Sequence, residues 1–166
     1  MEKQKTAMIT GSFDPVTSGH MDLLRRASVM FDTVYAVIVF NTEKSTGAFT
    51  PGQRLELLDA AIRNEGLGNV KAVLHIGLTS DAAKALGAGV LVRGARSSTD
   101  FDYEYSLSQI MKRFDPELET VILPASPELS MISSTYVRDL LKYGCELGNA
   151  VPEGCGDMMK KLYKKE

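Results

Sequence analysis

Apolar residues recur along the chain with two different spacings, and stretches of the two kinds alternate for most of its length. Short runs rich in apolar and β-branched residues predict strands, because they are too short for typical helices. These runs occupy residues 6–9, 33–40, 69–76, 90–92 and 120–123. Apolar residues three and four positions apart predict helices in the intervals. The helical stretches occupy residues 21–31, a segment that starts at 51, and residues 80–86, 99–114, 133–143 and 152–163.

Strands that alternate with helices are typical of a parallel sheet with helices on both faces. The chain is therefore expected to form a single α/β domain over residues 1–166, with a Rossmann-like, doubly wound sheet of five parallel strands. The clearest helix start is Thr50-Pro51-Gly52-Gln53. There a threonine cap, a proline in the first helical position and a glutamine three residues after the cap form a capping box.

A polar turn bounded by glycines joins the first predicted strand to the first predicted helix. It reads Gly11-Ser12-Phe13-Asp14-Pro15-Val16-Thr17-Ser18-Gly19-His20. A helix N-terminus carries unpaired backbone N–H groups and partial positive charge, so it binds anions readily. His20 opens the helix and could donate to a phosphate there, although an arbitrary histidine is more often structural. The Ser12 hydroxyl could bond either a phosphate oxygen or its own backbone, and Asp14-Pro15 is expected to shape the turn.

Other stretches with unusual polar residues also follow predicted strands directly. They are residues 41–44, Thr79, residues 93–96 and residues 129–135. The carboxyl ends of parallel strands lie at one edge of a sheet, and ligands bind there where the strand order switches. These stretches and the glycine-bounded turn are therefore expected to converge on one binding site.

Three basic residues could supply positive charge at that edge. Lys44 alone would be a solvated surface lysine, but it lies in the loop after the second strand, beside the expected phosphate site. Arg93 and Arg96 follow an apolar strand, where a guanidinium group can bind a phosphate through two hydrogen bonds. Either arginine could instead pair with a carboxylate such as Asp100 or Asp102, and this alternative stays open.

Hydroxyl residues gather again before a predicted helix, in Ser130-Met131-Ile132-Ser133-Ser134-Thr135. Any one of the three consecutive hydroxyls could cap the helix. Three together exceed what a cap requires, and they offer hydroxyl and N–H groups to a polyphosphate. Arg138 lies one turn further along and could face the same anion.

Composition and charge exclude several classes of protein. Hydrophobic residues make up 44% and charged residues 24% of the 166, the net charge is −2 and the pI is about 5.8, so no basic surface for nucleic acid is expected. The longest apolar run, residues 34–40, is far shorter than the ~20 residues of a membrane span. We therefore expect a cytoplasmic protein without nucleic-acid or membrane partners.

Metal and cysteine chemistry are not prominent in the sequence. The spacing of cysteines and histidines does not fit zinc, so the expected metal is Mg²⁺ that arrives with a nucleotide and is held through phosphates and water. Cys145 and Cys155 are expected to be free thiols, because disulfides are rare in a reducing compartment.

Three motifs resemble those of a known family. Residues 11–20 resemble the nucleotidyltransferase signature G-[TS]-F-D-P-x-[TH]-x-G-H, and residues 132–138 resemble the second signature I-S-S-[TS]-x-[VI]-R. Between them, residues 93–104 resemble R-G-x-R-x-x-x-D-F-x-Y-E. This combination resembles the bacterial phosphopantetheine adenylyltransferases, and the resemblance extends from about residue 6 to Pro152.

The resemblance implies transfer of the adenylyl group of ATP to 4′-phosphopantetheine, giving dephospho-coenzyme A and pyrophosphate with Mg²⁺, by direct in-line attack on the α-phosphate. It implies that His20 stabilises charge on the α-phosphate and that Ser12 and Lys44 orient the attacking phosphate. Phosphopantetheine is expected at Ser12, Lys44, Thr79 and Arg93. ATP is expected at Ser12, Phe13, His20, Gly94, Ala95, Arg96, Glu104, Leu129, Ser130, Met131, Ile132, Ser133, Ser134 and Thr135. Members are typically homohexamers, often inhibited by coenzyme A.

Four alternative functions can be weighed against residues of the sequence. A nicotinamide mononucleotide adenylyltransferase shares both end signatures but is not expected to have residues 93–104 as they stand. A cytidylyltransferase usually has histidine where Thr17 lies, and a class I aminoacyl-tRNA synthetase would need further domains. A non-catalytic nucleotide sensor would be expected to have lost His20 or Lys44. Two positions depart from the pattern of the phosphopantetheine adenylyltransferases or match it weakly. The loop that starts at Asn41 commonly reads N-P-x-K in that family, whereas Thr42 replaces the proline here. Thr79 belongs to a weak motif.

Overall fold

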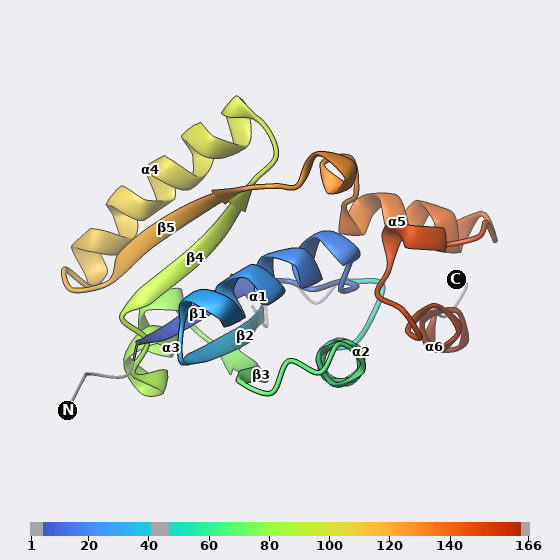
Figure 1. Cartoon of the computed structure of the whole chain (residues 1–166), viewed down its shortest axis with the longest axis horizontal. Helices are drawn as coiled ribbons and strands as arrows, with labels where there is room; N and C mark the ends of the chain where they lie inside the picture. Colours follow the sequence, from blue (N-terminus) through green and yellow to red (C-terminus); the bar gives the residue numbers. More distant parts are fainter. Residues whose placement is uncertain (1–4, 41–46, 164–166) are drawn as a thin grey trace.

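The computed structural model describes residues 5–40 and 47–163. Its centre is one sheet of five parallel strands in the order β3-β2-β1-β4-β5 (Figure 1). The strands are β1 (Thr6–Gly11), β2 (Thr33–Phe40), β3 (Val70–Ile76), β4 (Val90–Ala95) and β5 (Glu119–Pro124). The helices are α1 (Ser18–Met30), α2 (Pro51–Asn64), α3 (Thr79–Leu86), α4 (Ser98–Phe114), α5 (Ser134–Lys142) and α6 (Gly156–Leu162). Two 3-10 turns, η1 (Pro127–Leu129) and η2 (Gly148–Ala150), complete the structure.

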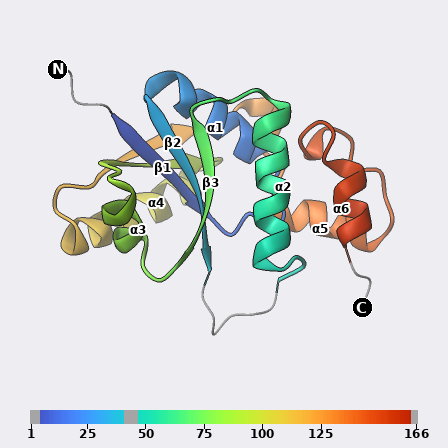
Figure 2. The same cartoon turned by 90° about the horizontal axis from the view of Figure 1, so that it is seen from below.

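Helices cover both faces of the sheet, as the alternation of strands and helices predicts. Successive side chains of β1 point to opposite faces, so Ala7 and Ile9 pack in the core beneath α1 and α2. Met8 points the other way and packs with Ala82 of α3 and with Leu118. In Figure 2, α2 and α3 lie on opposite sides of the strands. The predicted doubly wound α/β fold is therefore confirmed.

The strand order switches direction between β1 and β4. The chain winds outward from β1 through β2 to β3, then returns to place β4 on the other side of β1. The connections after β1 and β4 consequently leave to opposite faces, and a hollow forms between their carboxyl ends. The glycine-bounded turn follows β1, and Arg96 follows β4, so both lie beside this hollow.

Several predicted bounds of strands and helices are wrong, and hydrogen bonding explains why two strands are longer than predicted. β1 continues to Gly11 and β4 to Ala95, because their last residues still pair with β2 and β5. Apolar patterning did not reveal these ends, since glycine and arginine occur in them. α1 begins at Ser18, ahead of His20 and of the apolar residues 21–31, and the predicted capping box at Thr50 is confirmed.

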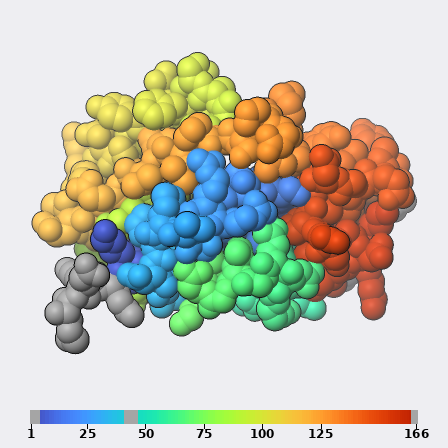
Figure 3. Space-filling model, in the orientation of Figure 1, coloured from blue at the N-terminus to red at the C-terminus, as the bar shows by residue number. Residues whose placement is uncertain are grey.

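The C-terminal segment is less helical than predicted. α6 begins at Gly156 instead of residue 152, because residues 152–155 form a turn in which the Cys155 N–H donates to the Pro152 carbonyl and Gly154 has φ 76°. α5 and α6 lie together at the end of the molecule away from α3 and α4 (Figure 3, red). The Tyr163 ring contacts the Phe49 ring with centroids 6.0 Å apart, which joins this segment to the start of α2.

Among the described residues, no helix combines the length and the apolar character that crossing a bilayer requires. Cys145 is exposed and Cys155 buried, and both are free thiols as predicted.

Candidate active site

A cavity of about 340 Å³ opens at the carboxyl ends of β1 and β4, where the strand order switches. Residues from four separated stretches line it, which confirms that the polar stretches after these strands converge. The sequence-predicted site residues in its wall are Ser12, His20, Arg93, Gly94, Arg96, Glu104, Leu129, Ile132, Ser133 and Ser134.

The turn after β1 combines unusual backbone geometry with a capped helix. Phe13 has φ 44°, and the Asp14–Pro15 peptide bond is cis. Thr17 then caps α1: its hydroxyl accepts from the His20 N–H, while the His20 ring accepts from the Thr17 N–H. This is a capping box in which a histidine takes the place usually held by glutamate or glutamine.

The hydrogen bonds of His20 determine its tautomer. Its Nδ1 accepts from the Thr17 backbone N–H at 3.0 Å, with the Thr17 Oγ1 also 3.0 Å away. Because Nδ1 is an acceptor, the neutral ring carries its proton on Nε2. Burial, followed by the positive charges of Arg96 and Arg93, lowers the pKa of His20 from 6.5 to about 4. At neutral pH His20 is therefore a neutral Nε2–H donor.

Arg93 joins three elements within the cavity wall. Its Nε and Nη2 donate to both carboxylate oxygens of Glu104, at 2.7 and 2.8 Å. Its Nη1 donates to the carbonyl and the hydroxyl of Thr10, at 2.7 and 3.0 Å. Four of its five N–H groups are thus used within the protein. The alternative of a carboxylate partner holds for Arg93, although that partner is Glu104 and not Asp100 or Asp102.

Arg96 lies nearer the open side of the cavity. Its backbone N–H and its Nε donate to Asp100 at 3.1 and 3.0 Å, so the carboxylate alternative holds here as well. Burial acts to raise the pKa of Asp100, but the hydrogen bonds and charge of Arg96 outweigh it and lower that pKa. The side chain of Arg96 is about half exposed, at 46%, and its remaining N–H groups can reach a ligand.

The hydroxyl groups at the start of α5 make different hydrogen bonds. Ser133 caps the helix by accepting from the Tyr136 N–H, as the capping alternative predicts. The Ser134 hydroxyl donates to the Pro15 carbonyl at 2.8 Å. Arg138 donates to the Asp14 carbonyl at 2.7 Å and to the Thr135 hydroxyl. Ser134 and Arg138 therefore hold the turn after β1 as well as lying near the expected anion site.

Some predicted residues do not line this cavity. Phe13 is fully buried and its ring packs 4.8 Å from the ring of His20, so it supports the histidine from behind. Thr79 starts α3, after the edge strand β3. Ala95, Ser130, Met131 and Thr135 are also absent from the wall. Lys44 falls outside the described residues, and the ligand contacts of all these residues stay predictions.

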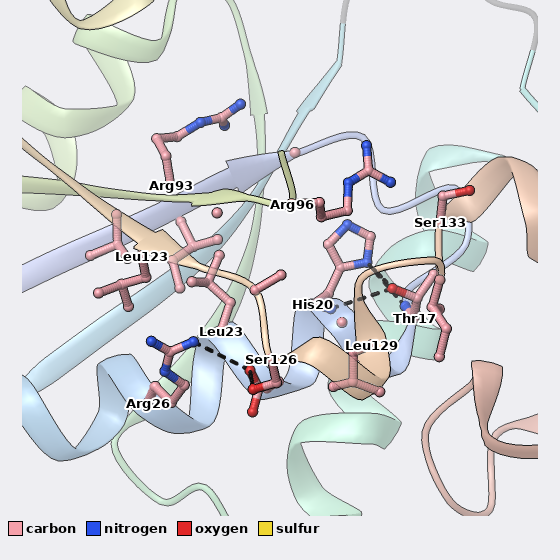
Figure 4. Close-up of a pocket in the computed structure, with 18 of the residues that line it drawn as sticks. Thr17, His20, Leu23, Arg26, Arg93, Arg96, Leu123, Ser126, Leu129 and Ser133 are labelled. Atoms are coloured by element: carbon pink, nitrogen blue, oxygen red, sulfur yellow. Dashed lines mark hydrogen bonds and ion pairs between the residues drawn. The ribbon is translucent and has the colours of Figure 1, made fainter. Parts of the chain in front are cut away.

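The far end of the cavity contains a group that the sequence reading missed. Asp22 accepts from Ser126 at 2.9 Å, and Arg26 donates to Asp22 at 3.5 Å and to the Pro124 carbonyl at 2.7 Å. Figure 4 shows Arg26 and Ser126 beside one another, with His20 and Arg96 toward the other end. Asp22 and Arg26 are four residues apart, which in sequence suggests only a surface pair on a helix. The contact with the loop after β5 could be found only from the fold.

Metal ligands are sparse in this site. Within residues 5–40 and 47–163, no group of three histidine, cysteine, aspartate or glutamate side chains could hold a metal ion. The donors that line the cavity are mostly cationic, hydroxyl or N–H groups. This set suits polyphosphate oxygens better than it suits a metal ion held by the protein itself.

The sequence of the chain matches those of known proteins. The family model of the cytidylyltransferase-like proteins matches residues 8–140. The phosphopantetheine adenylyltransferase of Streptococcus pneumoniae (strain CGSP14) is 44% identical over 150 residues, which cover 90% of this chain and 91% of that protein. The phosphopantetheine adenylyltransferase of Leptospira biflexa is 38% identical over 157 residues, covering 95% and 96%. The chain belongs to the phosphopantetheine adenylyltransferase family.

Membership of the phosphopantetheine adenylyltransferase family agrees with the resemblance carried by residues 11–20, 93–104 and 132–138. A crystal structure assigned to a nicotinate-nucleotide adenylyltransferase of Vibrio parahaemolyticus superposes with a TM-score of 0.72, covering 99% of this chain and 98% of that one. At 18% identity this likeness concerns the fold alone.

Proposed function

We propose that this protein transfers the adenylyl group of ATP to 4′-phosphopantetheine and releases pyrophosphate, forming dephospho-coenzyme A. The observation that carries the proposal is the near full-length similarity to phosphopantetheine adenylyltransferases, together with a neutral His20 at the switch-point cavity. The phosphate oxygen of phosphopantetheine attacks the α-phosphorus of ATP, and the bond from that phosphorus to the bridging oxygen of pyrophosphate breaks. No covalent enzyme intermediate is required.

Charge stabilisation and positioning supply the catalysis, since phosphoryl-type transfers leave little covalent work for the protein. The Nε2–H of His20 donates to an oxygen of the α-phosphate as negative charge builds up there. Ser12, which lines the cavity on the same turn, is assigned to orient the attacking phosphate, and Lys44 is assigned the same role. Arg96 and the N-terminal end of α5 would take the outer phosphates.

Roles for Arg93 and Glu104 follow from their pairing. Because the two side chains neutralise one another through two hydrogen bonds, they present a nearly neutral wall to the ligand. One N–H of Arg93 remains for phosphopantetheine. Mg²⁺ would arrive with ATP, held by its phosphates and water, and would neutralise charge on the polyphosphate.

The test is a pyrophosphate-release assay on the purified protein with ATP and either phosphopantetheine or nicotinamide mononucleotide. We expect release with phosphopantetheine only, and formation of dephospho-coenzyme A confirmed by mass spectrometry. Omission of Mg²⁺ should abolish turnover. Release with nicotinamide mononucleotide alone would overturn the proposal.

We also propose that the protein assembles as a homohexamer and works in the cytoplasm. Large apolar side chains on one face of α4 support an assembly, because Tyr103, Ile110 and Phe114 are each at least 46% exposed in the single chain. Coenzyme A differs from the product dephospho-coenzyme A by one phosphate group, so we propose that it binds the same site and inhibits. Inhibition that weakens as phosphopantetheine is raised would support this.

A further inference from the structure

A buried ion pair lies beside the active-site turn and has no part in the proposed chemistry. Three charged side chains are buried in the part of the chain that the structure describes: Asp14, Arg54 and Glu104. Glu104 is the partner of Arg93, whereas Asp14 and Arg54 pair with one another, with 3.3 Å between Asp14 Oδ1 and Arg54 Nε. Each is only 7% exposed. A buried pair contributes little to stability compared with apolar residues of similar size, so this one invites another explanation.

The contacts of the pair join the turn after β1 to the segment that enters α2. The carboxylate of Asp14 accepts from the backbone N–H groups of Ala48 and Phe49, at 3.0 and 2.9 Å. Arg54 donates to the Phe49 carbonyl at 2.8 Å and to the Ser12 carbonyl at 3.3 Å. Residues on two different connections of the sheet are therefore held through one pair of side chains.

Gly47 shows how closely the backbone approaches this pair. A Cβ atom at Gly47 would lie 1.8 Å from Arg54 Nη2 and 2.7 Å from Asp14 Oδ2. Neither distance is compatible with a real side chain, and the guanidinium group is buried, so it has little room to move aside. Glycine is required here because the backbone itself covers the ion pair.

The other side of the turn is fastened from α5. Ser134 and Arg138 donate to the carbonyls of Pro15 and Asp14. The carbonyl of Ser12 thus accepts from α2, whereas those of Asp14 and Pro15 accept from α5. Among the residues that the structure describes, Arg54 is the one of these three donors that also contacts the segment before α2, at the Phe49 carbonyl.

We propose that the Asp14–Arg54 pair is a positioning device that fixes Ser12 relative to Ala48 and Phe49 before α2, and so places the Ser12 hydroxyl that orients the attacking phosphate. This inference rests on the proposed adenylyl transfer. Misplacing a reactive group by about 1 Å can cost ~10²-fold in rate. A purely structural pair would instead affect stability and leave turnover of the folded enzyme unchanged.

The first test compares Arg54→Lys and Arg54→Met with Arg63→Met, an exposed arginine on the same helix. Lysine keeps the charge beside Asp14 but cannot donate to Ser12 and Phe49 in the fixed geometry of a guanidinium group. We expect Arg54→Lys to recover most of the melting temperature lost in Arg54→Met, yet both to lower kcat by ~10–100-fold. Arg63→Met should retain kcat. The proposal would be overturned if Arg54→Lys, assayed at a temperature well below its melting temperature, had the kcat of the wild type.

The second test substitutes no charged residue. Gly47→Ala should displace Arg54 and lower kcat to a similar extent, whereas Gly52→Ala, on α2 with open space around its Cβ position, should not. Backbone amide exchange at Ala48 and Phe49 should speed up in Gly47→Ala and in Arg54→Met. Activity and amide exchange together separate the two proposals. A wild-type protein without adenylyl-transfer activity contradicts the proposed function. Exchange as slow as in wild type at both amides, in both variants, overturns the positioning role.

Discussion

His20 works as a neutral donor because of what surrounds it. Thr17 supplies the hydrogen bond that fixes the tautomer, and burial, followed by the charges of Arg96 and Arg93, lowers the pKa of the ring. A charged histidine would be costly beside Arg96, whereas a neutral Nε2–H can approach a phosphate and strengthen its contact as charge develops. The motif in the sequence predicts the residue, but only the structure shows the charge state.

The depressed pKa of His20 predicts how stability depends on pH. The unfolded chain titrates this group near 6.5 and the folded protein near 4, so between these values the unfolded state binds more protons. The free energy of unfolding should therefore fall as the pH is lowered from 6.5 toward 4. Urea denaturation at several pH values should show a flatter dependence for His20→Gln, and NMR titration of the wild-type ring should give a midpoint near 4. A midpoint near 6.5 would contradict the buried neutral state.

Removing the imidazole should affect turnover more than binding. His20→Ala should lower kcat by ~10²–10³-fold, the usual cost of one charge-stabilising donor. ATP should still bind, because most residues of the cavity wall remain, and titration calorimetry can measure this. A kcat within a few-fold of wild type would remove His20 from the mechanism.

At the scale of elements, the start of α1 serves two purposes. Thr17 caps the helix and orients the imidazole of His20 through one reciprocal pair of hydrogen bonds. Capping boxes were recognisable in the sequence at Thr50, where glutamine follows three residues later, but not at Thr17, because histidine is not the usual partner. Asp22 and Ser126 illustrate a second gap: they are 104 residues apart, and no local pattern predicts their hydrogen bond.

Thr17→Ala should therefore cost stability and alter His20 as well. We expect the free energy of unfolding to fall by ~0.5–2 kcal/mol, the cost of losing an N-cap, measured as a lower urea midpoint at an unchanged slope. Thr50→Ala is the matched control, since it removes the same kind of capping box from α2. Both variants should lose similar stability, but only Thr17→Ala should shift the NMR titration of His20. An unchanged titration in Thr17→Ala would show that the backbone bond alone holds the ring.

At the scale of the whole molecule, alternation of strands and helices predicts the class of fold and the edge at which the site forms. It predicts less well where elements end, because β1 and β4 extend through glycine and arginine that carry no apolar signal. The pairing of Arg93 with Glu104, like that of Asp14 with Arg54, depends on how distant elements pack. The sequence thus predicts ten of the residues that line the cavity, but not the network that fixes them.

Assembly is the remaining property of the whole molecule that the structure makes testable. Tyr103, Ile110 and Phe114 are spaced seven and four residues apart, so they form one exposed apolar stripe along α4. A side chain such as Ile110 contributes ~1.5–3 kcal/mol when it is buried, and a charge placed there would be desolvated at further cost.

If this stripe is the contact between copies, Ile110→Glu should weaken association by at least ~10-fold, since 1.4 kcal/mol corresponds to a factor of ten. Gln109→Glu adds the same charge on an adjacent exposed position away from the stripe, and should leave assembly intact. Sedimentation over a range of concentrations distinguishes these outcomes: we expect assemblies for wild type and Gln109→Glu, and a shift toward the 18.1 kDa monomer for Ile110→Glu. A monomeric wild type, or equal assembly of both variants, would contradict a role of this stripe.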